Sequence, residues 1–201
     1  MAFNYILAQT AYHPYPNNYC GGFALDAILY DLNGHNPQPI ETYNGIQASQ
    51  NGLAANSQAL INKPELIAGD TYISLPSSIA IYASQSNMHV NVCVFVNNVL
   101  VNAIPDFGDV LPEEKIRIQN NNILYTEFNG SHTLQDVLDQ NELYSYYIVL
   151  VNEGGHWVAV KKENGRYCMY DPADGSETSF DANGNILQCY NWNGVAIGIG
   201  L

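Results

Sequence analysis

The feature that most constrains the fold is a series of three apolar segments separated by two short turns that contain glycine. The segments are SYYIVLVN, HWVAVKK and RYCMYD, and the turns between them are EGG and ENG, all within residues 145–171. Apolar segments of strand length joined by tight glycine turns are typical of an antiparallel meander. Further strand patterns lie at 89–96, 115–119, 122–128 and 195–200.

The first part of the chain has the three- and four-residue periodicity of helices instead. Residues 20–34 place apolar side chains on one face, and Gly34 is a suitable stop at the C-terminal end. Two further helices are expected at 46–61 and 77–87, the second capped by the serines at its start, and a short one at 133–140. Most helices therefore come before most strands.

This order predicts an α+β fold, in which grouped helices pack on an antiparallel β-sheet. We expect a single domain over residues 1–201, because no repeat or low-complexity linker divides the chain. Its helical lobe is expected at about 1–88 and its β lobe at about 89–201. A cleft between two such lobes is a common place for a ligand.

The charge balance limits the partners. Nineteen acidic residues against six basic ones give a net charge of −13. Such a surface repels phosphate backbones and anionic lipid, so we expect neither nucleic acid nor membrane partners. The N-terminal residues carry neither a basic leader nor a small-residue cleavage site, so we expect a cytoplasmic protein unless the chain is already processed. The sequence does not indicate an oligomeric state.

Four cysteines are present, at positions 20, 93, 168 and 189. They are too few and too scattered for a disulfide scaffold, and no CxxC or HExxH spacing suggests a metal site. No glycine–lysine loop for phosphate occurs either, so no cofactor is expected. Cys93 alternates with valines and is expected to be a small core residue on a strand.

Cys20 begins the first expected helix and is followed by Gly21 and Gly22. A helix N-terminus favours a thiolate, because its backbone N–H groups are unpaired and the helix dipole is positive there. The two glycines remove bulk beside the sulfur, which would let a substrate backbone approach. The alternative is a buried structural cysteine followed by an ordinary glycine turn.

His156 and Asp171 complete a candidate site. His156 begins a strand directly after a glycine turn, where an imidazole can project from the sheet edge as a general base. Asp171 ends the next strand, so a hairpin in register would bring it beside His156, where its carboxylate would orient the ring. Taken one at a time, each residue has a simpler explanation: His156 as a histidine in a turn, and Asp171 as the residue that begins a turn before Pro172. Together with Cys20 they form a Cys-His-Asp arrangement.

The stretches YCGGFAL and GGHWVAVKKENGRYCMYDPADG resemble papain-like cysteine peptidases. They are most similar to the bacterial double-glycine leader peptidase domains, and HWVAVKK is also similar to josephin-type deubiquitinases. The resemblance implies a papain-like fold that needs no cofactor and acts on a protein or peptide substrate. It also implies that a thiolate–imidazolium pair attacks an acyl carbonyl, and that the resulting acyl-enzyme transfers its acyl group to water or another nucleophile.

The same resemblance implies a glutamine that helps to hold the oxyanion, about six residues before the cysteine. Pro14 occupies that position here, and the nearest glutamine is Gln9, eleven residues before Cys20. We assign the oxyanion role to Gln9, with the loop HPYPNN as an insertion. Asn17 and Asn18 are the competing amides.

Other functions fit the same residues. A glutamine deamidase, a transglutaminase-like enzyme or a peptidoglycan amidase would use the same three side chains, because the acyl-enzyme does not record which amine left. A papain-like fold without activity that binds peptides is a further alternative. The acidic composition, the few lysines and the resemblance together suggest a bacterial effector, exported by a dedicated route that needs no signal peptide.

Overall fold

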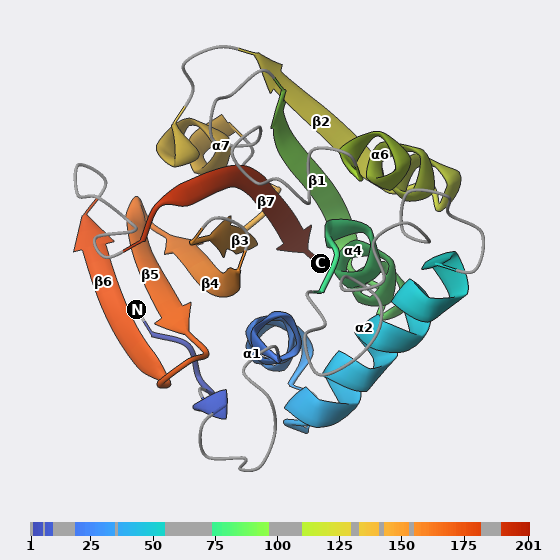
Figure 1. Cartoon of the computed structure of the whole chain (residues 1–201). Coiled ribbons are helices and arrows are strands. Elements are labelled where there is room, and N and C mark those ends of the chain that lie inside the picture. The colour runs from blue at the N-terminus through green and yellow to red at the C-terminus, as the bar shows by residue number, and fades with distance from the viewer. Residues whose placement is uncertain are drawn as a thin grey trace.

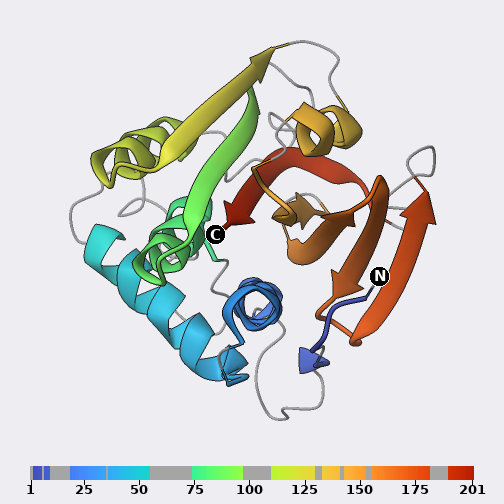
Figure 2. The same cartoon turned by 180° about the vertical axis from the view of Figure 1, so that it is seen from behind.

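The computed structural model describes residues 2–5, 7–9, 19–34, 36–54, 74–96, 110–129, 133–140, 143–152, 155–181 and 190–201. Within these ranges, seven strands form one sheet in the order β2-β1-β7-β3-β4-β5-β6. The strands are β1 (His89–Val96), β2 (Leu124–Asn129), β3 (Tyr146–Val151), β4 (His156–Glu163), β5 (Arg166–Asp171), β6 (Ser176–Asp181) and β7 (Trp192–Gly200). The sheet bends around helix α1 (Cys20–Asn33), which is seen nearly end-on in Figures 1 and 2.

The expected meander is present, because β3, β4, β5 and β6 are consecutive antiparallel neighbours. Strand β6 extends this meander beyond the expected segments. Strand β7 returns between β1 and β3 and is antiparallel to both. The pair β1–β2 departs from the expected antiparallel sheet, since it is parallel. Helix α6 (Leu111–Asn120) makes the crossover that such a pair requires.

The remaining helices are α2 (Pro39–Ala54), α4 (Pro76–Gln85) and α7 (Leu134–Gln140). Helix α1 packs on α2 and β4, α2 packs on α4, and α7 packs on β7. The expected helix at 46–61 therefore begins earlier, at Pro39, and residues 55–61 lie outside the described residues. No helix in the described ranges is long and apolar enough to cross a membrane.

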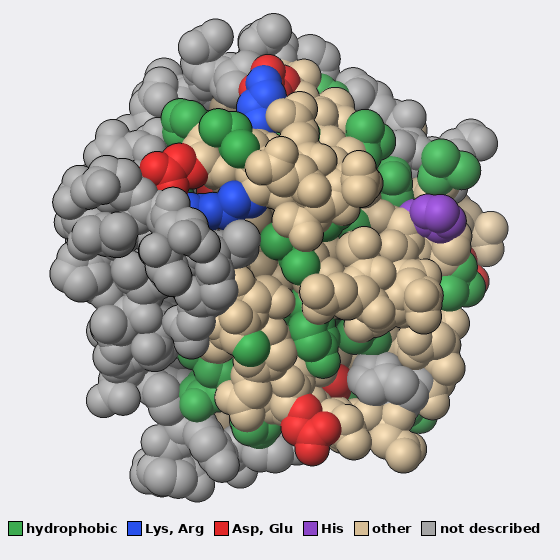
Figure 3. Space-filling view, turned by 90° about the vertical axis from the view of Figure 1, so that its right-hand side faces the viewer, with side chains coloured by type: hydrophobic (Ala, Val, Ile, Leu, Met, Phe, Trp, Pro, Cys, Tyr) green, Lys and Arg blue, Asp and Glu red, His purple; other side chains and the backbone are tan. Residues whose placement is uncertain are grey.

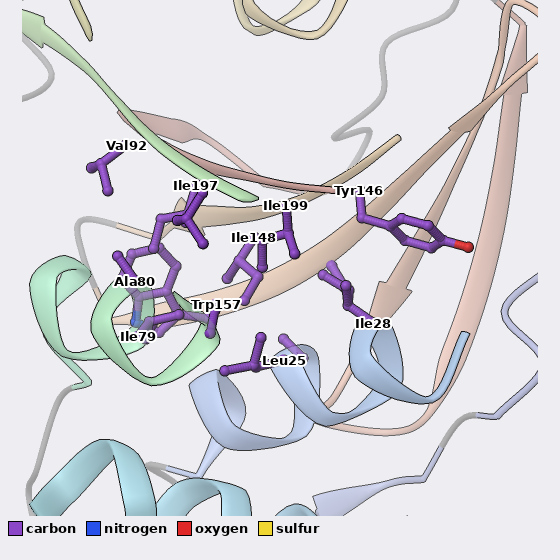
Figure 4. Packing of buried hydrophobic residues seen from close by; sticks show 14 of the residues in the cluster. Leu25, Ile28, Ile79, Ala80, Val92, Tyr146, Ile148, Trp157, Ile197 and Ile199 are labelled. Atoms are coloured by element: carbon purple, nitrogen blue, oxygen red, sulfur yellow. The ribbon is translucent and has the colours of Figure 1, made fainter. Parts of the chain in front are cut away.

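Helix α1 is the central element of the core. Every residue from 20 to 29 is buried, so this part of the helix is covered on all sides, which is typical of a helix inside a domain. Figure 4 shows Leu25 and Ile28 facing Ile148 and Trp157 of the sheet. The helix ends as expected at Gly34, whose φ of 66° is in the left-handed region and whose N–H bonds to the Tyr30 carbonyl oxygen at 2.8 Å.

The strand expected at 115–119 is wrong, because these residues belong to α6. The alternation of KIRIQ has the period of a strand, but Pro112 stands in the first turn of a helix, where proline is favoured. Arg117 bonds back to Glu113 at 3.0 Å and to Glu114 at 2.6 Å, contacts that helical spacing makes possible.

The serine cap expected for the helix at 77–87 is also wrong. Leu75 is the N-cap residue of α4 and makes no side-chain capping bond. The carboxylate of Glu114 instead accepts bonds from the backbone N–H of Ser77 at 2.7 Å and from its hydroxyl at 2.9 Å. A side chain from α6 therefore accepts the hydrogen bond of a backbone N–H that has no partner within α4.

On the described part of the face seen in Figure 3, hydrophobic side chains lie in small groups separated by other side chains and backbone. Exposed large hydrophobic side chains among the described residues include Ile116, Leu124, Leu143 and Leu201. Such separate residues are normal on a protein surface and indicate no binding patch.

Candidate active site

Cys20 is the first residue of α1, as expected, and is 4% exposed. The first helical hydrogen bond joins the Phe23 N–H to the Tyr19 carbonyl oxygen at 3.0 Å. The N-cap residue Tyr19 makes no side-chain capping bond, and no acidic residue lies in the first turn. The positive end of the helix dipole at Cys20 is therefore not offset by a carboxylate of α1 itself.

His156 and Asp171 come together through the hairpin of β4 and β5. Ala159 is opposite Tyr170 in the register, and from this pair the two strands continue toward His156 and Asp171. His156 Nε2 and Asp171 Oδ1 lie 2.8 Å apart, and both side chains are buried. The expected contact between the two residues is present.

Three effects act on the charge of the His156 ring. Burial lowers its pKa, but hydrogen bonds with Asp171 and with the thiol of Cys20, together with the charges of both groups, raise it to about 9. Because Nε2 faces Asp171, the other ring nitrogen, Nδ1, is the one available to the Cys20 sulfur. The structure thus brings Cys20, His156 and Asp171 together around one imidazole.

Asp171 accepts hydrogen bonds from three of the described residues. In addition to His156, the backbone N–H of Ala173 binds Oδ1 at 2.8 Å, and the hydroxyl of Tyr190 donates to Oδ2. Burial raises the pKa of Asp171, but these hydrogen bonds outweigh it and lower the pKa below its usual value. The carboxylate is therefore held in its ionised form beside the imidazole.

Tyr190 was not expected from the sequence. It lies 19 residues beyond Asp171, in a stretch with no motif, and its ring centroid is 5.6 Å from that of His156 at an interplanar angle of 53°. No local pattern marks it, because its place depends on how β7 pairs with the rest of the sheet.

Gln9 lies close to the end of β5. Its backbone N–H donates a 2.8 Å hydrogen bond to the carbonyl oxygen of Pro172, the residue after Asp171. The hydroxyl of Tyr170 donates to the Leu7 carbonyl oxygen at 2.5 Å, and the Gln9 side chain is buried. The N-terminal segment is thus fixed against the strand that carries Asp171. Asn17 and Asn18 lie outside the described residues.

The two glycines after Cys20 have a different role from the one expected. A Cβ atom at Gly22 would lie 2.8 Å from the Tyr43 Cα, and one at Gly21 would lie 2.8 Å from the Ser74 Oγ. Both positions therefore allow α1 to pack closely on its neighbours. The chain itself, and not a substrate, occupies the space beside these glycines.

The other described cysteines lie in the core. Cys93 is buried on β1, as expected, and burial raises its pKa to about 12. Cys168 is buried on β5, where burial and the carboxylate of Glu177 raise its pKa. Among the described residues, no group of three or more histidine, cysteine and acidic side chains is placed to hold a metal ion.

No family model matches the sequence, and no curated protein matches it. A double glycine motif protease from an AMS/PCAT transporter, solved in complex with the leader peptide, is similar in structure. Its TM-score is 0.50 and its sequence identity 11%, over 97% of this chain and 89% of that chain. The Pseudomonas avirulence protein AvrPphB gives a TM-score of 0.45 and 11% identity, over 97% of this chain and 96% of that chain. The first likeness confirms the papain-like α+β fold expected from the sequence.

Proposed function

We propose that this chain is a papain-like thiol hydrolase that cleaves a peptide bond, with Cys20 as the nucleophile. The proposal rests on one observation above the others. The thiol at the start of α1 lies beside His156, and the far ring nitrogen of His156 is 2.8 Å from an Asp171 oxygen. Covalent acyl transfer requires this arrangement: a nucleophile, a base beside it and a third group that orients the base.

In the proposed reaction, His156 takes the proton of Cys20 and the thiolate attacks the carbonyl carbon of the substrate. The C–N bond then breaks, and the imidazolium donates its proton to the departing amine. A water molecule next loses a proton to His156 and attacks the thioester. The C–S bond breaks, the carboxylic acid leaves and Cys20 recovers its proton. Asp171 stays ionised throughout and stabilises the imidazolium.

The negative oxygen of each tetrahedral intermediate needs hydrogen-bond donors. We assign one to the backbone N–H of Cys20, because the first N–H groups of a helix have no partner within the helix. We assign the second to the side-chain amide of Gln9. The backbone bond from Gln9 to Pro172 supports this assignment, since it keeps Gln9 beside the strand that ends in Asp171.

A peptide is the proposed substrate. The protease of similar fold was solved in complex with a leader peptide. A glutamine deamidase, a transglutaminase-like enzyme or a peptidoglycan amidase would use the same steps up to the acyl-enzyme, so the product decides between them.

The test compares three proteins: wild type, Cys20→Ala and the control Cys168→Ala, which removes another buried cysteine that the proposed reaction does not use. Each is incubated with candidate proteomes, and mass spectrometry searches for new peptide N-termini and for deamidated glutamines. New N-termini with wild type and Cys168→Ala, but not with Cys20→Ala, are expected. Deamidation without cleavage would replace the peptidase with a deamidase, and activity in Cys20→Ala would refute the nucleophile.

A further inference from the structure

The Tyr190 hydroxyl reaches the oxygen of Asp171 that points away from His156. His156 Nε2 and the Ala173 N–H both bind Oδ1, whereas the Tyr190 hydroxyl donates to Oδ2. A carboxylate bound through one oxygen can still turn about its Cβ–Cγ bond. A donor on the second oxygen prevents that rotation and fixes the plane of the group.

Two strand ladders hold the backbone around Tyr190 in place. Val151 of β3 pairs with His156 on one side and with Trp192 of β7 on the other. The Asn152 N–H also donates to the Asn191 carbonyl oxygen at 3.2 Å. The residue pairs that place His156 therefore also place the chain that follows Tyr190.

We propose that Tyr190 is a positioning residue of the active site: its hydroxyl fixes Asp171 so that Oδ1 faces His156 Nε2, while its ring partly covers the pair. Tyr190 acts through Asp171 and needs no contact with the substrate. Its effect on turnover rests on the proposed function, but its effect on the imidazole does not.

The first experiment therefore measures the imidazole alone. In the Cys20→Ala background, which removes both turnover and the thiol, the pKa of His156 is obtained by NMR titration of its ring signals. Among the described residues, Cys20 and Asp171 are the charged groups with the largest effect on this ring, so Asp171 is the main one that remains.

Adding Tyr190→Phe keeps the ring and removes only the hydroxyl. The carboxylate then loses its fixed orientation, and the pKa of His156 is expected to fall toward its value in Cys20→Ala/Asp171→Asn. An unchanged pKa would overturn the proposal. A raised pKa would overturn it too, since that would mean that the hydroxyl only draws charge from Asp171.

Tyr167→Phe is the matched control. Tyr167 also donates its hydroxyl to a carboxylate, that of Asp139. Neither residue of this pair is among the main described influences on the pKa of His156 or Asp171. The same chemical change in the same background is expected to leave the pKa of His156 where it was. An equal fall in both variants would show a general loss of structure and would overturn the assignment to Tyr190.

The second experiment is a double-mutant cycle on kcat/KM with a cleaved peptide. Tyr190→Phe is expected to lower kcat/KM about tenfold in the wild-type background, as for a lost bond to a charged group. Tyr190→Phe should cause no further loss in the Asp171→Asn background, because the carboxylate through which Tyr190 acts on the imidazole is already absent. Equal losses in both backgrounds would overturn the proposal. If wild type cleaves nothing, the proposed function fails and the NMR titration still decides the role of Tyr190.

Discussion

The indole Nε1 of Trp157 donates a 2.9 Å hydrogen bond to the carbonyl oxygen of Ser74, although 83 residues separate them. Trp157 directly follows His156 and is buried. The side chain of Ser74 lies against Gly21, the residue after Cys20. The short segment before α4 thus contacts both the strand that carries His156 and the helix that begins at Cys20, which limits how far the two can separate.

Cys20 is expected to be the cysteine that iodoacetamide alkylates fastest near neutral pH. Cys20 is only 4% exposed, so solvent exposure cannot be the cause of fast alkylation. We expect the cause to be the reactive thiolate that forms beside His156. Burial raises the pKa of Cys93 to about 12 and also raises that of Cys168, so both should react slowly. The measurement is a mass-spectrometric time course on the folded protein.

A urea-unfolded sample, in which all four cysteines should react, serves as its control, and His156→Gln should slow the reaction of Cys20. If Cys168 or Cys189 reacts as fast as Cys20 in the folded protein, the nucleophile has been assigned wrongly.

Turnover is expected to respond differently to the loss of His156 and of Asp171. His156→Ala should abolish it, since it removes both the proton carrier and the charge that stabilises the thiolate. Asp171→Asn should lower kcat by about 10²-fold but leave measurable activity, because an amide oxygen can still accept the bond from Nε2. Steady-state kinetics on one peptide checks both variants. The reverse order, an inactive Asp171→Asn beside an active His156→Ala, would contradict the roles of base and orienting group.

The contribution of His156 to stability is expected to fall with rising pH. Folding raises its pKa from 6.5 to about 9, so the protonated ring stabilises the folded state. This stabilisation is fully present below pH 6.5 and is lost as the pH rises to about 9, a change of about 3 kcal/mol.

Urea unfolding of wild type and His156→Gln between about pH 6 and about pH 10 measures this change. The difference in the free energy of unfolding should shrink over this range. A difference that stays constant would show that the protonated ring does not stabilise the folded state.

The contact between His156 and Asp171 was predictable because its causes are local. The turn ENG joins two apolar strands, and a tight turn sets the register of the hairpin. Helix α1 was predictable for the same reason, from its apolar periodicity and from Gly34 at its end. In both cases the signal and the structure lie within a few residues of each other.

Tyr190 and the packing of the glycines were not predictable, because their causes lie far away in sequence. Tyr190 reaches Asp171 only because β7 pairs with β3. No sequence pattern near Tyr190 indicates which strand β7 will pair with. Gly22 is needed because Tyr43 of α2 packs against it. The bond between Glu114 and the Ser77 N–H at the start of α4 likewise joins residues that are 37 positions apart in the chain.

Glu114→Ala is expected to destabilise the fold by about 3 kcal/mol, because it removes both bonds to Ser77 and leaves the buried Arg117 with one acid fewer. Lys115→Ala is the matched control on the same helix. It breaks an ion pair with Glu127 in which both side chains are more than a third exposed, so the loss should stay below about 1 kcal/mol. Urea unfolding measures both, and equal losses would contradict the role of Glu114 at the start of α4.

Gln9→Ala is expected to lower kcat by about 10²-fold with little change in KM, as for the loss of one oxyanion donor. The oxyanion forms only as the reaction proceeds, so its donor affects the transition state more than substrate binding. The alkylation rate of Cys20 should stay fast, because Gln9 is not needed to form the thiolate.

Asn17→Ala and Asn18→Ala provide the comparison, since both amides lie nearer to Cys20 in the sequence. We propose Gln9 for the role, because it is buried and its backbone N–H bonds to the Pro172 carbonyl oxygen beside Asp171. Kinetics of the three variants on one peptide decides the assignment. An unchanged kcat in Gln9→Ala, together with a large loss in either asparagine variant, would give the role to that asparagine.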